Sequence, residues 1–166
     1  MKIGIRTGLI IALFATIIGL QSCEDGTSTP NYIVGRTTRS AWEANVGFNG
    51  YTEYTPAAAA VQAIRDTMTR HTGIRFSVFA SPWCGTCVHS TPQVFKTLDA
   101  IGYPDSLLLF VALDSDKSDP EGLARKDNVA TVFALIIKNN DIEIGRITGA
   151  YQPWEIAIAT ILEKVK

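Results

Sequence analysis

Cys84 and Cys87 stand two residues apart in the stretch W-C-G-T-C. A C-x-x-C pair of this kind is a redox-active dithiol, half of a metal site or a coincidence. A metal site would need further ligands, and the chain has no second C-x-x-C and no pair of histidines at ligand spacing. Only His71 and His89 remain as nitrogen donors, and we expect His89 to lie on the surface of a helix. We therefore assign no metal site, although metal binding by the two thiols alone stays open.

The residues around the pair predict a junction between a strand and a helix. Residues 75–80, R-F-S-V-F-A, are typical of a strand, and a helix is expected from about Cys84 to Ile101, with Gly102 past its end. The first sulfur would then lie at a helix N-terminus, where free N–H groups and the helix dipole stabilise a thiolate. Cys84 is thus the predicted nucleophile. Cys87, one turn later, is the predicted resolving thiol.

The remaining elements are read from periodicity and turn residues. A helix is expected from Thr55 as N-cap, with Pro56 at its first position. Further predicted elements are a strand at 106–113 that is covered on both faces, a short helix at 121–126, and hairpin strands at 131–137 and 142–147 around N-N-D. The chain then ends with an amphipathic helix in the stretch that begins Q-P-W-E-I. This order predicts one three-layer α/β domain over residues 55–166.

The first residues resemble an export signal. Lys2 and Arg6 precede the short apolar run 9–20, and L-Q-S-C at residues 20–23 resembles a bacterial lipobox. This predicts a signal peptide over 1–22, lipid on Cys23 and a protein held outside the cytoplasm, at the periplasmic face or the outer membrane. The alternatives are an ordinary secretory peptide with a coincidental Cys, or an uncleaved anchor.

Composition narrows the remaining possibilities. The chain has 166 residues, 46% of them hydrophobic, which is enough for one domain with its own core. Its net charge is −1 and its 15 Lys and Arg form no basic run, so nucleic acid is not an expected partner. Residues 23–54 are rich in Gly, Thr, Ser and Asn and are interpreted as a tether that is partly ordered against the domain.

The order of elements and the W-C-G-T-C motif together resemble the thioredoxin family over residues 55–166. Trp83 before the first Cys, and Pro92 five residues after the second, match positions that many members share. The resemblance implies a central mixed sheet with helices on both faces and a dithiol active site. Gly85 is expected to allow a tight turn. Thr86 stands where thioredoxins proper carry Pro, so the redox potential should differ from theirs.

Three positions depart from the family pattern. Phe133 falls on the family's cis-proline, and a trans Val132–Phe133 bond is expected because a non-proline cis bond costs about 3–4 kcal/mol. Val78 stands where the family carries a buried Asp, and Ala112 or a neighbour stands where it carries the Lys partner, which leaves the resolving thiol without the family's base. The nearest candidate by sequence, Asp114, is interpreted as a solvated carboxylate at a strand end.

These observations predict a membrane-anchored thiol–disulfide oxidoreductase that needs no cofactor beyond its two thiols. Its expected partners are disulfides of exported proteins and a membrane electron donor or acceptor. Two alternatives are a redox-inactive binding module with a structural Cys84–Cys87 disulfide, and a metal-binding thiol pair.

Overall fold

The computed structural model describes residues 33–150 and 153–165, which form one mixed five-stranded sheet with helices packed on it. The strands are β1 (Gly35–Arg36), β2 (Ile74–Ala80), β3 (Leu109–Ala112), β4 (Ala134–Asn139) and β5 (Ile142–Thr148). The helices are α1 (Arg39–Asn45), α2 (Ala58–Arg70), α3 (Gly85–Ile101), α4 (Leu123–Lys126) and α5 (Trp154–Leu162), with a 3₁₀ turn, η1, at Asp105–Leu107. The predicted signal peptide and Cys23 lie outside the described residues.

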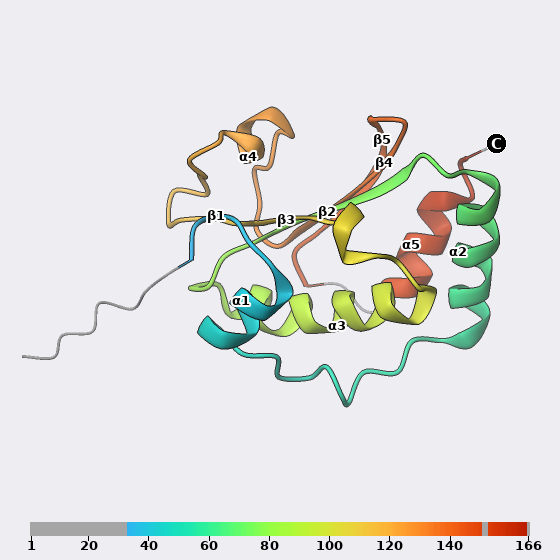
Figure 1. Ribbon diagram of the computed structural model, residues 1–166, viewed down its shortest axis with the longest axis horizontal. Coiled ribbons are helices and arrows are strands. Elements are labelled where there is room, and N and C mark those ends of the chain that lie inside the picture. The colour runs from blue at the N-terminus through green and yellow to red at the C-terminus, as the bar shows by residue number, and fades with distance from the viewer. Residues whose placement is uncertain (1–32, 151–152, 166) are drawn as a thin grey trace, which may run out of the picture.

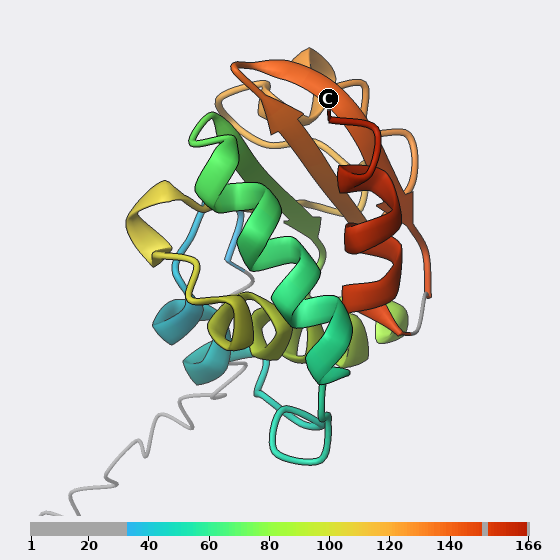
Figure 2. The same cartoon turned by 90° about the vertical axis from the view of Figure 1, so that its right-hand side faces the viewer.

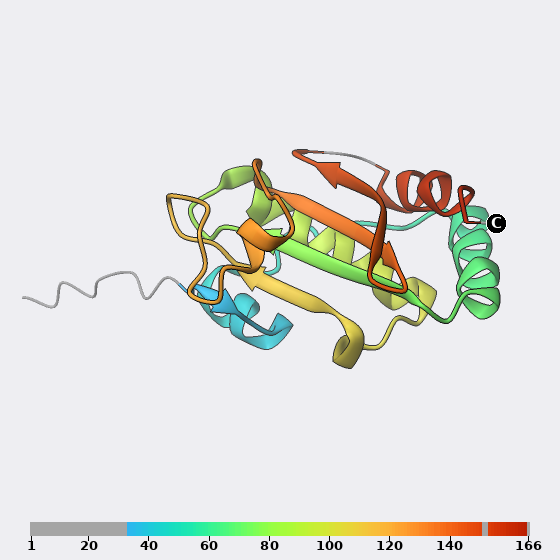
Figure 3. The same ribbon diagram turned by 90° about the horizontal axis from the view of Figure 1, so that it is seen from above.

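The strands lie in the order β1-β3-β2-β4-β5 (Figure 3). Strands β2 and β3 are parallel, with Val78 opposite Phe110, and α3 forms the crossover between them. Strand β4 is antiparallel to β2, and β5 is antiparallel to β4. Asn140 and Asp141 both adopt positive φ, +50° and +65°, as a tight hairpin turn requires. The predicted βαβ half followed by a hairpin and a helix is thus present.

The helices cover the two faces of the sheet unequally. Helices α1, α2, α3 and α5 lie on one face, where α2 and α5 run side by side, and the short α4 covers part of the other (Figures 1 and 2). The larger core contains buried side chains from β2, β3, β4 and all four helices of its face. The smaller core joins the opposite side of the strands to α4. The fold class predicted from the sequence is confirmed.

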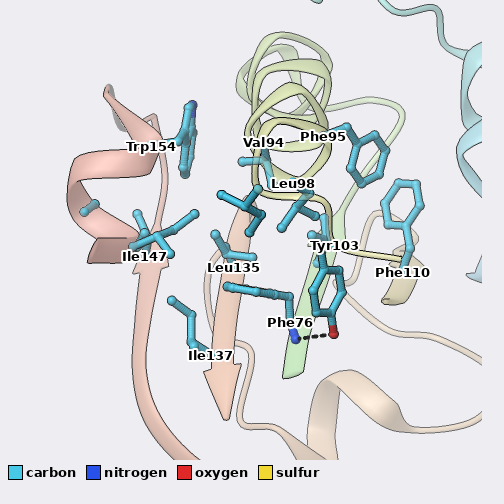
Figure 4. Packing of buried hydrophobic residues seen from close by; sticks show 14 of the residues in the cluster. Phe76, Val94, Phe95, Leu98, Tyr103, Phe110, Leu135, Ile137, Ile147 and Trp154 are labelled. Atoms are coloured by element: carbon cyan, nitrogen blue, oxygen red, sulfur yellow. Dashed lines mark hydrogen bonds between the residues drawn. The ribbon is translucent and has the colours of Figure 1, made fainter. Parts of the chain in front are cut away.

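Aromatic side chains occupy much of the larger core (Figure 4). Phe95 of α3 meets Phe110 of β3 edge to face, with ring centroids 5.0 Å apart. Tyr103 packs edge to face on Phe76 at 4.8 Å, and its hydroxyl accepts a hydrogen bond from the Phe76 N–H at 3.2 Å. The same hydroxyl donates to the Leu107 carbonyl at 2.9 Å. These contacts fix α3, and with it the C-x-x-C motif, against the sheet.

The described part of the N-terminal extension, residues 33–54, is built into this core. Strand β1 pairs antiparallel with β3, so Gly35 lies opposite Ala112 within the sheet. Trp42 of α1 is fully buried, with its ring 5.2 Å from that of Phe110. The extension was predicted to be only partly ordered, but its described residues are well ordered. The sheet therefore begins before residue 55, where the domain was expected to start.

Two elements begin later than predicted because other contacts hold their first residues. Helix α2 begins at Ala58 rather than Pro56, since the Ala57 N–H donates to Glu155 Oε1 at 3.1 Å and keeps the chain extended there. Strand β3 begins at Leu109 rather than residue 106, since η1 forms a tight turn before it.

Two further boundaries move by two or three residues. Helix α4 begins at Leu123 rather than residue 121, because the Asp119 carboxylate accepts the Leu123 and Ala124 N–H groups and sets the first turn there. Strand β4 begins at Ala134 rather than residue 131. Within the described ranges, no helix combines the length and the apolar character that crossing a membrane requires.

Candidate active site

The C-x-x-C motif lies where β2 passes into α3. Cys84 is the N-cap of α3, with extended dihedral angles (φ −93°, ψ 110°), and its sulfur accepts the Cys87 N–H at 3.3 Å. Its own N–H donates to the Ser81 carbonyl at 3.1 Å, which closes the turn between the strand and the helix. Cys84 is partly exposed. This junction is the one that the sequence predicts, with the first sulfur at the helix N-terminus.

Cys87 lies one turn further along and is fully buried. Both cysteines are free thiols in this structure. Removal from water, followed by a hydrogen bond to the Cys84 side chain, raises the pKa of the Cys87 thiol well above its ordinary value. A hydrogen bond from the Ser81 backbone acts in the opposite direction. The two thiols are thus inequivalent, because one meets solvent and the other is held protonated inside the core.

The Val132–Phe133 peptide bond is cis, so the expectation of a trans bond at this position is wrong. The surroundings of Phe133 differ from those of an isolated peptide, for which the trans preference holds. Its ring is fully buried, 5.2 Å from that of Trp154, and its carbonyl accepts the Gly149 N–H at 2.8 Å. Tertiary contacts thus decide the conformation here.

The other residues predicted around the site lie in varied surroundings. Trp83 is 43% exposed beside Cys84, whereas Pro92 is buried within α3. Thr86 is half-buried. Gly85 is expected to allow a tight turn, but the turn does not require glycine, because Gly85 lacks a positive φ and an added Cβ would meet no atom within 4 Å. Any residue that accepts the first turn of a helix would fit there.

The interior next to Cys87 carries no charge at the two positions singled out by the sequence. Val78 and Ala112 are fully buried in the same core as Cys87. The Asp114 carboxylate accepts the N–H groups of Asp116 and Ser118 at 2.9 and 2.8 Å, so it shapes its own loop after β3. The resolving thiol therefore has neither partner that the family pattern supplies.

One buried carboxylate was not identified from the sequence. Glu155, only 2% exposed, accepts the Tyr54 hydroxyl at 2.6 Å. That hydroxyl also accepts the Trp154 N–H at 2.8 Å, and the Trp154 indole donates to Gln93 of α3 at 3.1 Å. The only sequence signal at Glu155 is an acidic residue in the first turn of a helix. Such residues are common on protein surfaces, so the sequence did not indicate that Glu155 is buried. This network joins the extension, α5 and the active-site helix.

The part of the chain that the structure describes supplies no further metal ligands to the thiols. Among residues 33–150 and 153–165, no three His, Cys, Asp or Glu side chains gather closely enough to hold a metal ion. His89 is exposed, as expected, and His71 follows the end of α2. The site therefore consists of two thiols, a helix N-terminus and a largely apolar interior.

A mixed sheet of this order, with a dithiol that caps the crossover helix, defines a thioredoxin-like α/β protein. No family model matches the chain. A thioredoxin from Echinococcus granulosus is 35% identical to it over 72 residues, which are 43% of this chain and 62% of that protein. The chain thus matches somewhat less than two thirds of this curated relative. The resemblance to the thioredoxin family is confirmed.

Solved thioredoxin structures are also similar. Mitochondrial thioredoxin 3 of Saccharomyces cerevisiae shares 24% identity and a TM-score of 0.41, with 69% of this chain and 98% of that chain covered. Fasciola hepatica thioredoxin shares 21% identity and a TM-score of 0.42, with 62% and 91% covered.

Proposed function

We propose that the protein is a thiol–disulfide oxidoreductase that exchanges its Cys84–Cys87 dithiol with disulfides of exported proteins. The observation that carries this proposal is the inequivalence of the two thiols. Cys84 is partly exposed at the N-terminus of α3, while Cys87 is buried one turn away and donates its N–H to the Cys84 sulfur. A nucleophile that meets a protein substrate needs access to solvent, whereas a resolving thiol acts within the protein and needs to lie close to the mixed disulfide.

The reaction proceeds in two exchanges. The Cys84 thiolate attacks a substrate disulfide, a mixed disulfide forms, and the first substrate sulfur departs with the electron pair and takes a proton from water. Cys87 then loses its proton to water and attacks the Cys84 sulfur, so the second substrate sulfur departs and is protonated in turn. The dithiol is oxidised by two electrons and the substrate disulfide is reduced by two. The reverse sequence oxidises a substrate dithiol, and the membrane electron partner sets the direction.

Reduction of insulin disulfides by the pre-reduced full-length protein tests the proposal. Cys84→Ser should abolish the reaction, because it removes the attacking sulfur. Cys87→Ser should stop after the first exchange and accumulate a mixed disulfide that mass spectrometry detects. Equal insulin reduction by the wild-type protein and Cys84→Ser would end the proposal.

Membrane anchoring through Cys23 is part of the same proposal and rests on the lipobox-like L-Q-S-C at residues 20–23. Expression in bacteria grown with labelled palmitate should label the wild-type protein and leave Cys23→Ser unlabelled. Label retained in Cys23→Ser, or absent from both proteins, would contradict a lipid on this sulfur.

A redox-inactive binding module is the second candidate, and the full burial of Cys87 beside the uncharged Val78 and Ala112 favours it. A static disulfide would then close between Cys84 and Cys87. Its reduction potential should lie below about −300 mV, in the range of structural disulfides. A potential near those of known oxidoreductases, about −120 to −270 mV, would exclude this candidate.

A further inference from the structure

Two hydroxyl groups in the segments that flank the C-x-x-C motif are buried without a hydrogen-bond partner. Ser81 and Thr91 are both fully excluded from solvent, and neither side-chain oxygen makes a hydrogen bond. A buried polar group that lacks a partner destabilises a protein, so such groups are uncommon and call for an explanation. The two residues come from the segments before and after the C-x-x-C motif.

Thr91 differs from other helical threonines of this protein. Four threonine hydroxyls donate to the carbonyl four residues earlier in their helices, namely those of Thr67, Thr69, Thr97 and Thr160. For Thr91 the equivalent acceptor is the carbonyl of Cys87, and that bond is not formed. Residues four apart are neighbours on one helix face, and a helical side chain covers the turn before it. The Thr91 side chain therefore lies over the turn that carries Cys87.

Ser81 approaches the same sulfur from the other side of the motif. Its carbonyl accepts the Cys84 N–H at 3.1 Å, and its backbone acts to lower the pKa of the Cys87 thiol. The core that contains Cys87 includes Val78 and Ala80 of β2 and Ala112 of β3, which carry no charge. Cys84 is the titratable group that acts on the Cys87 thiol.

We propose that the hydroxyls of Thr91 and Ser81 donate hydrogen bonds to the Cys87 sulfur when it becomes a thiolate in the second exchange. This inference rests on the proposed oxidoreductase function. A buried thiolate is unfavourable unless donors stabilise it, and a hydroxyl can turn toward a new acceptor without moving the backbone. The two groups would stabilise the resolving thiolate without a buried carboxylate, and the released proton still passes to water.

The reaction with 5,5′-dithiobis-(2-nitrobenzoate) separates the two exchanges. Cys84 attacks this disulfide and releases one coloured thiolate; Cys87 then resolves the mixed disulfide and releases a second. All variants carry Cys23→Ser, so that only the two site thiols react. The rate of each phase is measured from pH 6 to pH 10.

Thr91→Val and Ser81→Ala should each slow the second phase about tenfold or more and move its pH midpoint upward. The first phase should not change. Thr91→Ser keeps the hydroxyl and should keep the wild-type rate. Thr97→Val is the matched control, because Thr97 is equally buried in α3 but its hydroxyl is bonded to the Gln93 carbonyl at 3.1 Å. It should behave as wild type in both phases.

The outcomes separate this inference from the proposed function. If Thr91→Val and Ser81→Ala leave the rate and the pH midpoint of the second phase unchanged, the proposed role of the hydroxyls is overturned. The oxidoreductase function would still stand. Equal slowing by Thr91→Ser and Thr91→Val, or by Thr97→Val, would assign the effect to packing and would also overturn it. A wild-type protein that shows no second phase would instead contradict the oxidoreductase function.

Discussion

The buried hydrogen-bond network of Tyr54 gives a sharp test of how the N-terminal extension is held to the domain. The Tyr54 hydroxyl donates to Glu155 Oε2 at 2.6 Å and accepts the Trp154 N–H at 2.8 Å. Glu155 is 2% exposed, and its other oxygen accepts the Ala57 N–H at 3.1 Å. Tyr54→Phe removes both hydrogen bonds of the hydroxyl, and the buried Glu155 carboxylate loses one of its donors.

The expected cost follows from the kinds of bond that are lost. A hydrogen bond to a charged group contributes about 1.5–3 kcal/mol and a neutral one about 1 kcal/mol, so Tyr54→Phe should destabilise the protein by about 3 kcal/mol. Urea unfolding followed by circular dichroism measures this loss. With a slope of about 1–3 kcal/mol per M, the midpoint should fall by about 1–3 M.

Tyr51→Phe is a matched control for this substitution. The Tyr51 hydroxyl also bonds a carboxylate, that of Asp99, but Asp99 is exposed and also pairs with Arg39. Water can replace the lost phenol there, so the cost should stay below about 1 kcal/mol. If Tyr54→Phe were no more destabilising than Tyr51→Phe, the reasoning about the buried carboxylate would be refuted.

Three further predictions concern the core and the two thiols. Trp42→Ala should destabilise the protein by about 3–5 kcal/mol in urea unfolding, because the indole is fully buried. Ile142→Ala, at a residue that is 71% exposed, should change the stability by less than about 0.5 kcal/mol. Similar effects of the two substitutions would show that the extension is not part of the core. Iodoacetamide at pH 7.5 should modify Cys84 and leave Cys87 unmodified in the folded protein, as peptide mass mapping would report; faster modification of Cys87 would contradict its burial and its raised pKa. Burial raises the pKa of Cys87, so the native state keeps a proton that the unfolded chain loses above about pH 8.5. The stability of the reduced protein should therefore fall as pH rises above about 8.5, by up to about 1.4 kcal/mol per pH unit. An equal fall in Cys87→Ser would show that another group causes it.

Several features of this protein follow from short stretches of its sequence. The C-x-x-C spacing, the apolar run before it and Gly102 after the helix predicted α3 with Cys84 at its N-terminus, and the structure has this arrangement. The N-N-D turn likewise predicted the hairpin of β4 and β5. These features depend on residues within a few positions of each other, so periodicity and turn preferences suffice to predict them.

Some boundaries could not be predicted because distant residues decide them. Residues 33–54 have the composition of a tether, yet β1 completes one edge of the sheet and Trp42 enters the core against Phe110. From its sequence position in the first turn of a helix, Glu155 is expected on the surface. In the structure it is buried and accepts a hydrogen bond from Tyr54, 101 positions earlier.

The sequence alone therefore determined the order of the helices and main strands from residue 55 onward, the α/β class and the place of the dithiol on a helix N-terminus. Only the tertiary structure decided which thiol is buried, the cis bond at Val132–Phe133 and the unpartnered hydroxyls of Ser81 and Thr91. The physical reason is that burial and hydrogen-bond satisfaction are properties of a whole neighbourhood. At Cys87 that neighbourhood is assembled from α3 and the strands that pack beneath it.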